Sequence, residues 1–362
     1  MQKLQHSVYS LLFLVLAFSS LFFARDFLIP VAMAAIFSML FIKLCGWFEK
    51  KGSSRGMAAL YCVLIFIAAI SLIVFLLSWQ LSSLAENIDE MKQRLISFFN
   101  RARVWINESA GISLKAQEKM VKEQSESGSA SAGSMAASFA ASIFSMLVNT
   151  VLVLVYMYLF LVYRSHLKKF ILKLVPRDEK NTTVNVVDEA GKVAQHYLSG
   201  LGAMIAVLWV MYGIGFSLVG VENAIFFAVL CGLLEIIPFI GNLTGTSITV
   251  LAVLAQGGSG KMVILVIATY LVVQFIQTYI LEPLIVGEQV NINPLFTIMV
   301  LVLGEMLWGV PGMILAIPLL GIIKIICDHV PDLQPYGFLI GIENQKSKRT
   351  GVLDKIRNLF KR

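Results

Sequence analysis

The chain has 362 residues, of which 58% are hydrophobic and 14% are charged, and its formal net charge is +7. A soluble domain is about 25% charged, and a mean hydropathy of +0.81 leaves too few polar residues to cover the surface of a soluble fold. This composition excludes a soluble enzyme, a disordered protein and a nucleic-acid binder.

Charge-free apolar runs predict an all-α polytopic membrane protein. A spanning helix needs about 20 mostly apolar residues. Such runs cover 7–24, 27–42, 56–85, 135–163 and 193–221, and the chain then stays almost free of charge until Asp328. We expect about eight spans by hydropathy, made of about six full spans and two re-entrant hairpins or broken helices.

The Lys and Arg residues predict the orientation in the lipid bilayer. They concentrate in 43–55, 164–192 and 346–362, whereas 86–126 holds equal numbers of acids and bases. Basic loops stay in the cytoplasm. We therefore expect both termini in the cytoplasm and 86–134 outside, and this placement explains the positive charge without a nucleic-acid partner.

Two amphipathic stretches flank the fourth apolar run. Residues 84–105 place apolar side chains at alternating steps of four and three, which is typical of a coiled-coil seam; the seam packs either on its own domain or on a second subunit of a homo-oligomer. An amphipathic helix at the cytoplasmic lipid surface, ended by Pro176, is predicted by the apolar residues Leu167, Phe170, Ile171 and Leu174.

The pattern divides the chain into five expected segments. They are three N-terminal membrane helices (1–85), an extracytoplasmic helical segment and linker (86–134), a fourth membrane helix with the cytoplasmic amphipathic helix (135–192), a transport core (193–328) and a basic cytoplasmic tail (329–362).

Two windows in the C-terminal half resemble each other. Residues 220–256 and 290–326 are offset by 70 positions and pair Asn223 with Asn293, Glu235 with Glu305, and the breakers Pro238 and Gly241 with Pro311 and Gly312. A straight helix of about 35 residues would be roughly 50 Å long, well beyond the hydrocarbon thickness. We expect a hairpin or broken helix in each window, the two related as an inverted repeat, which is typical of a transporter substrate site. Two ordinary spans in place of each hairpin remain the alternative.

Three acids lie within the apolar sequence of this core, namely Glu235, Glu282 and Glu305. An acid at bilayer depth is costly and marks a functional site, because it can take up a proton or hold a cation. The alternative is a structural acid that caps a broken helix. The same core holds further polar candidates for substrate or ion binding: Asn223, Asn293, Gln274 and Gln277.

We expect no enzyme, no metal site and no cofactor. The four cysteines, Cys45, Cys62, Cys231 and Cys327, form no Cys-x-x-Cys pair. Gln256-Gly-Gly-Ser-Gly-Lys261 resembles a phosphate loop, but Ala255 and Met262 replace two residues that the motif needs. Gly241-Asn-Leu-Thr-Gly245 predicts close helix packing.

Several motifs together resemble the AI-2E family of bacterial transporters. They are Tyr197-Leu-Ser-Gly200, Gly220-Val221 followed by Ala224, Glu235-Ile-Ile-Pro-Phe-Ile-Gly241, Leu281-Glu-Pro-Leu-Ile-Val-Gly287, Asn293-Pro294 and Trp308-Gly-Val-Pro-Gly-Met-Ile-Leu-Ala-Ile-Pro318. The resemblance implies a secondary transporter of the bacterial inner membrane that exports autoinducer-2 or exchanges Na⁺ (or Li⁺) for H⁺. By resemblance the functional candidates are Glu235, Pro238, Gly241, Glu282, Pro283, Pro294, Pro311, Gly312 and Pro318.

The predicted function is therefore ion- or proton-coupled transport of a small polar solute or an ion. The alternative is an uncoupled, channel-like or scaffolding membrane protein.

Overall fold

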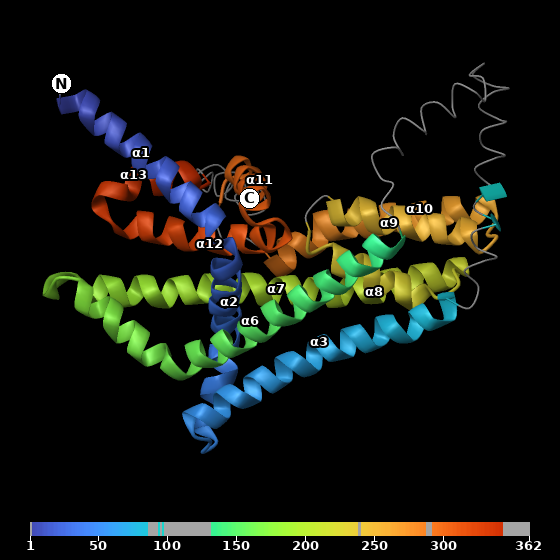
Figure 1. Cartoon of the computed structure of the whole chain (residues 1–362), viewed down its shortest axis with the longest axis horizontal. Helices are drawn as coiled ribbons and strands as arrows, with labels where there is room; N and C mark the ends of the chain where they lie inside the picture. Colours follow the sequence, from blue (N-terminus) through green and yellow to red (C-terminus); the bar gives the residue numbers. More distant parts are fainter. Residues whose placement is uncertain are drawn as a thin grey trace, which may run out of the picture. The chain divides into compact units, whose positions relative to one another are not determined.

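The computed structural model describes residues 2–85, 93–94, 96–97, 132–237, 240–286 and 292–342. These residues form helices joined by short turns (Figure 1), and the β pairing among them is one isolated bridge between Ile292 and Gly341. The all-α prediction is confirmed. Most of the predicted seam, the breaker Pro238 and the tail beyond residue 342 lie outside the described residues.

The chain divides into two compact units, each built from separated stretches of sequence. One unit comprises Met1–Arg25, Tyr163–Tyr197 and Glu288–Arg362, and the other comprises Asp26–Val162 and Leu198–Gly287. The first predicted window (220–256) falls in the second of these units, and the second window (290–326) falls in the first.

The N-terminal helices are α1 (Gln2–Phe23), α2 (Arg25–Lys50) and α3 (Arg55–Ala85). The turn after α2 contains Gly52 with φ of +97°, a conformation that glycine adopts without a Cβ clash. Small side chains let α2 and α3 pack closely with α6. This core is fully buried at Ala34, Cys45, Ala58, Ala59, Cys62, Met157 and Leu161.

The middle of the chain forms two long helices, α6 (Ala132–Leu174) and α7 (Lys180–Val219), separated by the 3₁₀ turn Arg177–Glu179. The amphipathic stretch near Leu174 is the end of α6 and not a separate helix, because no glycine or proline interrupts it before Pro176. The side chains of Leu167, Phe170, Ile171 and Leu174 are exposed there, as expected for a surface that meets lipid.

Both predicted windows fold as two helices that pack against each other. The first pair is α8 (Ala224–Leu234) and α9 (Ile240–Ala255), and the second is α11 (Pro294–Trp308) and α12 (Val310–His329) (Figure 1). Between the pairs lie α10 (Gly260–Ile276) and the π-helix η3 (Gln277–Val286). The chain continues after α12 with η4 (Pro331–Leu333) and α13 (Gln334–Ile340).

The breaks do not fall on all the residues predicted for them. Gly241 is the second residue of α9, and the second pair breaks at Gly309, with φ of +63°, whereas Pro311 and Gly312 lie inside α12. Pro311 fits there because the first turn of a helix does not use its backbone N–H groups for internal hydrogen bonds. Residues 256–259 form the turn before α10, and Gly260 and Lys261 begin that helix. Ser259 caps it by accepting from the N–H of Met262 at 3.3 Å.

Six helices of the described chain are long and apolar enough to cross a membrane. They are Arg25–Lys50, Arg55–Trp79, Val148–Leu174, Lys180–Val219, Gly260–Glu282 and Val310–His329. Shorter apolar helices are Leu11–Phe23, Ala224–Leu234, Gly241–Ala255 and Pro294–Trp308. The two pairs are therefore unequal, because α12 alone can span whereas α8 and α9 are each too short.

Candidate functional site

A buried carboxylate–amide pair stands at the break between α8 and α9. Glu235 is the residue that ends α8, and its backbone N–H donates to the carbonyl of Cys231 at 3.1 Å. Its Oε1 accepts a hydrogen bond of 2.7 Å from Nε2 of Gln277. Gln277 opens the π-helix and is 2% exposed. Two of the predicted candidates are thus brought together across 42 positions of sequence.

A second chain of amides runs along the same face of α10. Nδ2 of Asn242, in the first turn of α9, donates to Oε1 of Gln274, and Nε2 of Gln274 donates to the hydroxyl of Thr278 at 3.2 Å. Gln274 and Gln277 are three residues apart, so they lie on one helix face. Gln274, near the end of α10, and Gln277, at the start of η3, therefore both bond to residues beside the break between α8 and α9.

Two glycines allow α9 to approach the end of α8. A Cβ on Gly241 would lie 1.6 Å from the carbonyl oxygen of Leu234, and one on Gly245 would lie 3.1 Å from Sγ of Cys231. Any side chain at Gly241 would thus displace the backbone that carries Glu235. The Gly241–Gly245 spacing packs helices, as the sequence predicts.

Three oxygen atoms in this cluster accept no hydrogen bond although they are buried. They are Oε2 of Glu235, Oε1 of Gln277 and Oδ1 of Asn242. Glu235 receives its hydrogen bond from a side chain, and no described backbone N–H is bonded to its carboxylate.

Glu282 lies in the π-helix that Gln277 opens, and its side chain is exposed. It is close enough to Glu235 for the two carboxyl groups to interact electrostatically. The far end of this π-helix packs on α7, where a Cβ on Gly200 would lie 3.1 Å from the carbonyl oxygen of Ile285. π-helical segments within longer helices often accompany functional sites.

The remaining candidates have local roles or lie in the other compact unit. Oδ1 of Asn293 caps α11 by accepting from the N–H of Leu295 at 3.0 Å. Asn223 precedes α8 in a left-handed conformation with φ of +57°. Glu305 lies on α11 with an exposed side chain. Gly312 approaches Gly304 so closely that a Cβ would lie 1.9 Å from the carbonyl oxygen of Gly304.

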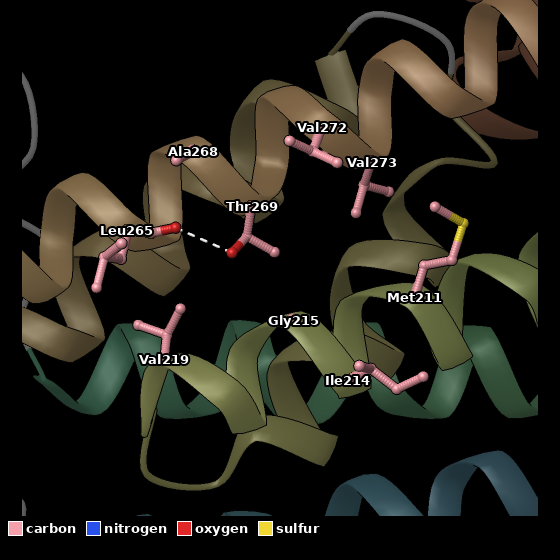
Figure 2. Close-up of a pocket in the computed structure, with 9 residues that line it drawn as sticks. All are labelled: Met211, Ile214, Gly215, Val219, Leu265, Ala268, Thr269, Val272 and Val273. Carbon is pink, nitrogen blue, oxygen red and sulfur yellow. Dashed lines mark hydrogen bonds between the residues drawn. The ribbon is translucent and has the colours of Figure 1, made fainter.

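A separate groove of about 450 Å³ lies between α7 and α10. Figure 2 shows Ile214, Gly215 and Val219 on one wall and Thr269 on the other. The Thr269 hydroxyl donates to the carbonyl of Leu265 at 2.9 Å, so its proton is used within its own helix. The other lining residues are apolar, and the groove is therefore unsuited to a polar solute.

Sequence reasoning did not select Thr278 or Gly304 as site residues. Asn242 directly follows the predicted breaker Gly241. Thr278 stands one helical turn after Gln274, and this spacing alone is a weak signal for a site residue. Among the described residues, no group of three or more His, Cys, Asp or Glu side chains could hold a metal ion. The four cysteines are free thiols and are buried.

The helices and this cluster define a polytopic membrane protein whose apolar core holds a carboxylate and several amides. Residues 11–332 match the AI-2E family transporter model. The chain belongs to the AI-2E transporter family, as its motifs predict.

Relatives cover nearly the whole chain. "Putative transport protein YrrI" of Bacillus subtilis is 24% identical over 84% of this chain and 87% of its own length. "Putative transport protein YhhT" of Escherichia coli is 23% identical over 96% and 97%, and "Putative permease PerM" of Escherichia coli is 27% identical over 90% and 93%. The family and these relatives support a membrane transport role.

Proposed function

We propose that the protein is a secondary transporter in which Glu235 couples the movement of a small polar solute or an ion to a cation gradient. The observation that carries this proposal is the Glu235–Gln277 hydrogen bond of 2.7 Å at a helix break within apolar sequence. An acid in such surroundings is retained against a large desolvation cost, which favours a functional role.

The backbone around Glu235 supports the same proposal. Transporters bind their substrates and coupling ions where spanning helices are interrupted, because unwound backbone there is free to coordinate. The α8–α9 break and the π-helix η3 both bring irregular backbone to this cluster. Export of an autoinducer-2-type signal and Na⁺ (or Li⁺)/H⁺ antiport, which the family resemblance implies, are the two specific forms that we propose for this transport.

The membrane setting is also part of the proposal. We infer a bacterial inner-membrane location with both termini in the cytoplasm, from the Lys and Arg distribution. We further propose that the tips of the two helix pairs reach into the protein and not into the bulk solvent. A homo-oligomer formed through the 86–134 segment remains a prediction.

Flux in proteoliposomes tests the coupling. Purified protein is reconstituted, a pH or Na⁺ gradient is imposed, and ion flux is followed with a fluorescent reporter in the lumen. Glu235→Gln removes the charge and nearly keeps the shape, so gradient-driven flux should fall at least tenfold while the protein stays folded. Glu305→Gln, the matched change in the second helix pair, should have a smaller effect because that side chain is exposed.

The alternative function has a distinct result in the same assay. A channel-like protein would pass ions down their own gradient without any response to an imposed gradient of a second ion. A scaffolding protein would give no flux at all. Normal gradient-driven flux in Glu235→Gln would exclude the coupling role of this residue.

A further inference from the structure

The groove between α7 and α10 runs along both helices for about the depth of one lipid leaflet. Figure 2 shows Met211 and Val273 toward one end of it and Val219 and Leu265 toward the other. Each wall therefore spans about two helical turns, or roughly 12 Å at 1.5 Å per residue. Half of the hydrocarbon thickness of a bilayer is about 15 Å. The groove thus has the length of an acyl chain in one leaflet.

The groove is open on one side, and that side is apolar. Its rim carries Ile214, Leu265 and Val272, whose side chains are 58%, 41% and 59% exposed. Its floor is the contact between the two helices, because a Cβ on Gly215 would overlap the side chain of Thr269. Both helices are long and apolar enough to cross a membrane. In a bilayer, the molecules that offer a matching apolar chain to this surface are the lipids.

Positive charge lies at one end of the groove. Lys261 precedes Leu265 by one helical turn, so it lies on the groove face of α10, and its side chain is exposed. The guanidinium of Arg94 donates to the carbonyl of Gln256, in the turn before α10, and brings a second cation to this end. The N-terminal end of a helix also favours an anion. The apolar groove with cations at one end complements a lipid with an anionic headgroup.

We propose that this groove binds one acyl chain of an anionic phospholipid, with the phosphate of the headgroup at Lys261. Lipid tails are as apolar as the groove, so the preference over bulk lipid comes from packing between the helices and from the headgroup charge. The site lies apart from the Glu235 cluster and holds neither the transported solute nor a coupling ion. The inference therefore goes beyond the proposed function and stands or fails separately from it.

An acid near the same end opposes the headgroup. Glu222 is exposed in the loop that follows α7. This loop lies beside the start of α10, because a Cβ on Gly220 would lie 3.7 Å from Cε of Met262. Glu222→Gln should therefore strengthen binding of the anionic lipid, whereas Lys261→Gln should weaken it. Effects of opposite sign from the two changes are a signature of headgroup charge.

Photo-crosslinking to the purified full-length protein in nanodiscs tests the proposal. The probe is phosphatidylglycerol that carries a diazirine on one acyl chain, diluted into phosphatidylcholine, and the labelled peptides are identified by mass spectrometry. In wild-type protein, the label should concentrate in residues 211–219 and 265–273. The apolar surface of α3 around Leu72 and Phe75, which is equally exposed, should carry less label.

Three variants separate the groove from general lipid contact. Ala268→Phe places a ring among the lining residues and should remove most of the label from both walls. Ala206→Phe is the matched control, because Ala206 is exposed on α7 and does not line the groove, and it should match wild type. Lys261→Gln should lower the preference for phosphatidylglycerol over a phosphatidylcholine probe about fivefold, as the loss of one surface charge implies.

Several results would overturn the inference. Wild-type label spread evenly over α3, α7 and α10 would mean that only unspecific lipid contacts exist. Absence of label from both walls in wild type would mean that another surface, such as a second copy of the chain, covers the groove, and neither result needs a variant to fold. Equal labelling of Ala268→Phe and wild type, or equal labelling by the two lipid probes, would also contradict it. The crosslinking uses no ion gradient, so its failure leaves the flux test of Glu235 unaffected.

Discussion

A guanidinium nitrogen of Arg94 donates a hydrogen bond of 2.5 Å to the backbone carbonyl of Gln256. Gln256 follows α9, and Arg94 belongs to the stretch between α3 and α6. The contact requires the end of α9 and Arg94 to lie on the same side of the membrane. From the charge distribution we expect 86–134 outside, so the turn between α9 and α10 should be outside as well.

Cysteine labelling checks this orientation. In a variant that lacks the native cysteines, Lys261→Cys lies beside this turn with an exposed side chain and should react with a membrane-impermeant maleimide in intact cells. Lys180→Cys, at the start of α7, should react only after the cells are opened. The opposite pattern would reverse the whole predicted topology. Labelling of both positions from outside would contradict the predicted cytoplasmic placement of 164–192.

Gly241→Ala should destabilise the first helix pair. The added Cβ would lie 1.6 Å from the carbonyl oxygen of Leu234, which is a backbone atom and cannot rotate away. Overpacking of this kind costs about 1–3 kcal/mol or more, and thermal unfolding in detergent should show a lower midpoint. Gly202→Ala in α7 is the matched control, because its Cβ would meet nothing within 4 Å. An equal effect of both changes would contradict the close approach at Gly241.

The same test applies to the second pair at Gly312. A Cβ there would lie 1.9 Å from the carbonyl oxygen of Gly304, so Gly312→Val should lower transport and thermal stability, although the variant should still insert in the membrane. Gly191→Ala, within the same compact unit, meets nothing within 4 Å and should be neutral. We would abandon the α11–α12 contact if Gly312→Val unfolded at the wild-type temperature.

Asn293→Ala should remove the side-chain cap of α11. Loss of an N-cap costs about 1 kcal/mol, so the free energy of unfolding should fall by that amount, measured by chemical denaturation in detergent. Asn293→Asp keeps an acceptor oxygen at the same place and should retain most of the stability. Loss of transport without loss of stability in Asn293→Ala would instead assign this residue to the substrate site.

Local features of the fold could be predicted from the sequence. Asn293-Pro294 is a helix start because the Asn side chain caps the first turn and proline fits within it, and α11 begins there. The break after Glu235 could be predicted because the apolar window that contains it is too long for a single membrane crossing. The helix start depends on neighbours within one helical turn and the break on the length of one apolar window, so composition and spacing suffice for both.

The site itself depended on the tertiary structure. Gln277 was one of several polar residues on its helix, and only the packing of α10 beside the α8–α9 break brings it to Glu235, 42 positions away. Gly309 rather than Pro311 breaks the second pair, because proline in a first turn continues the helix. The approach of Gly304 to Gly312 has no local signature either. Sequence by itself determined where helices start, stop and carry charge, since these are short-range properties, whereas the partners of buried polar groups are set by which helix surfaces fit together in space.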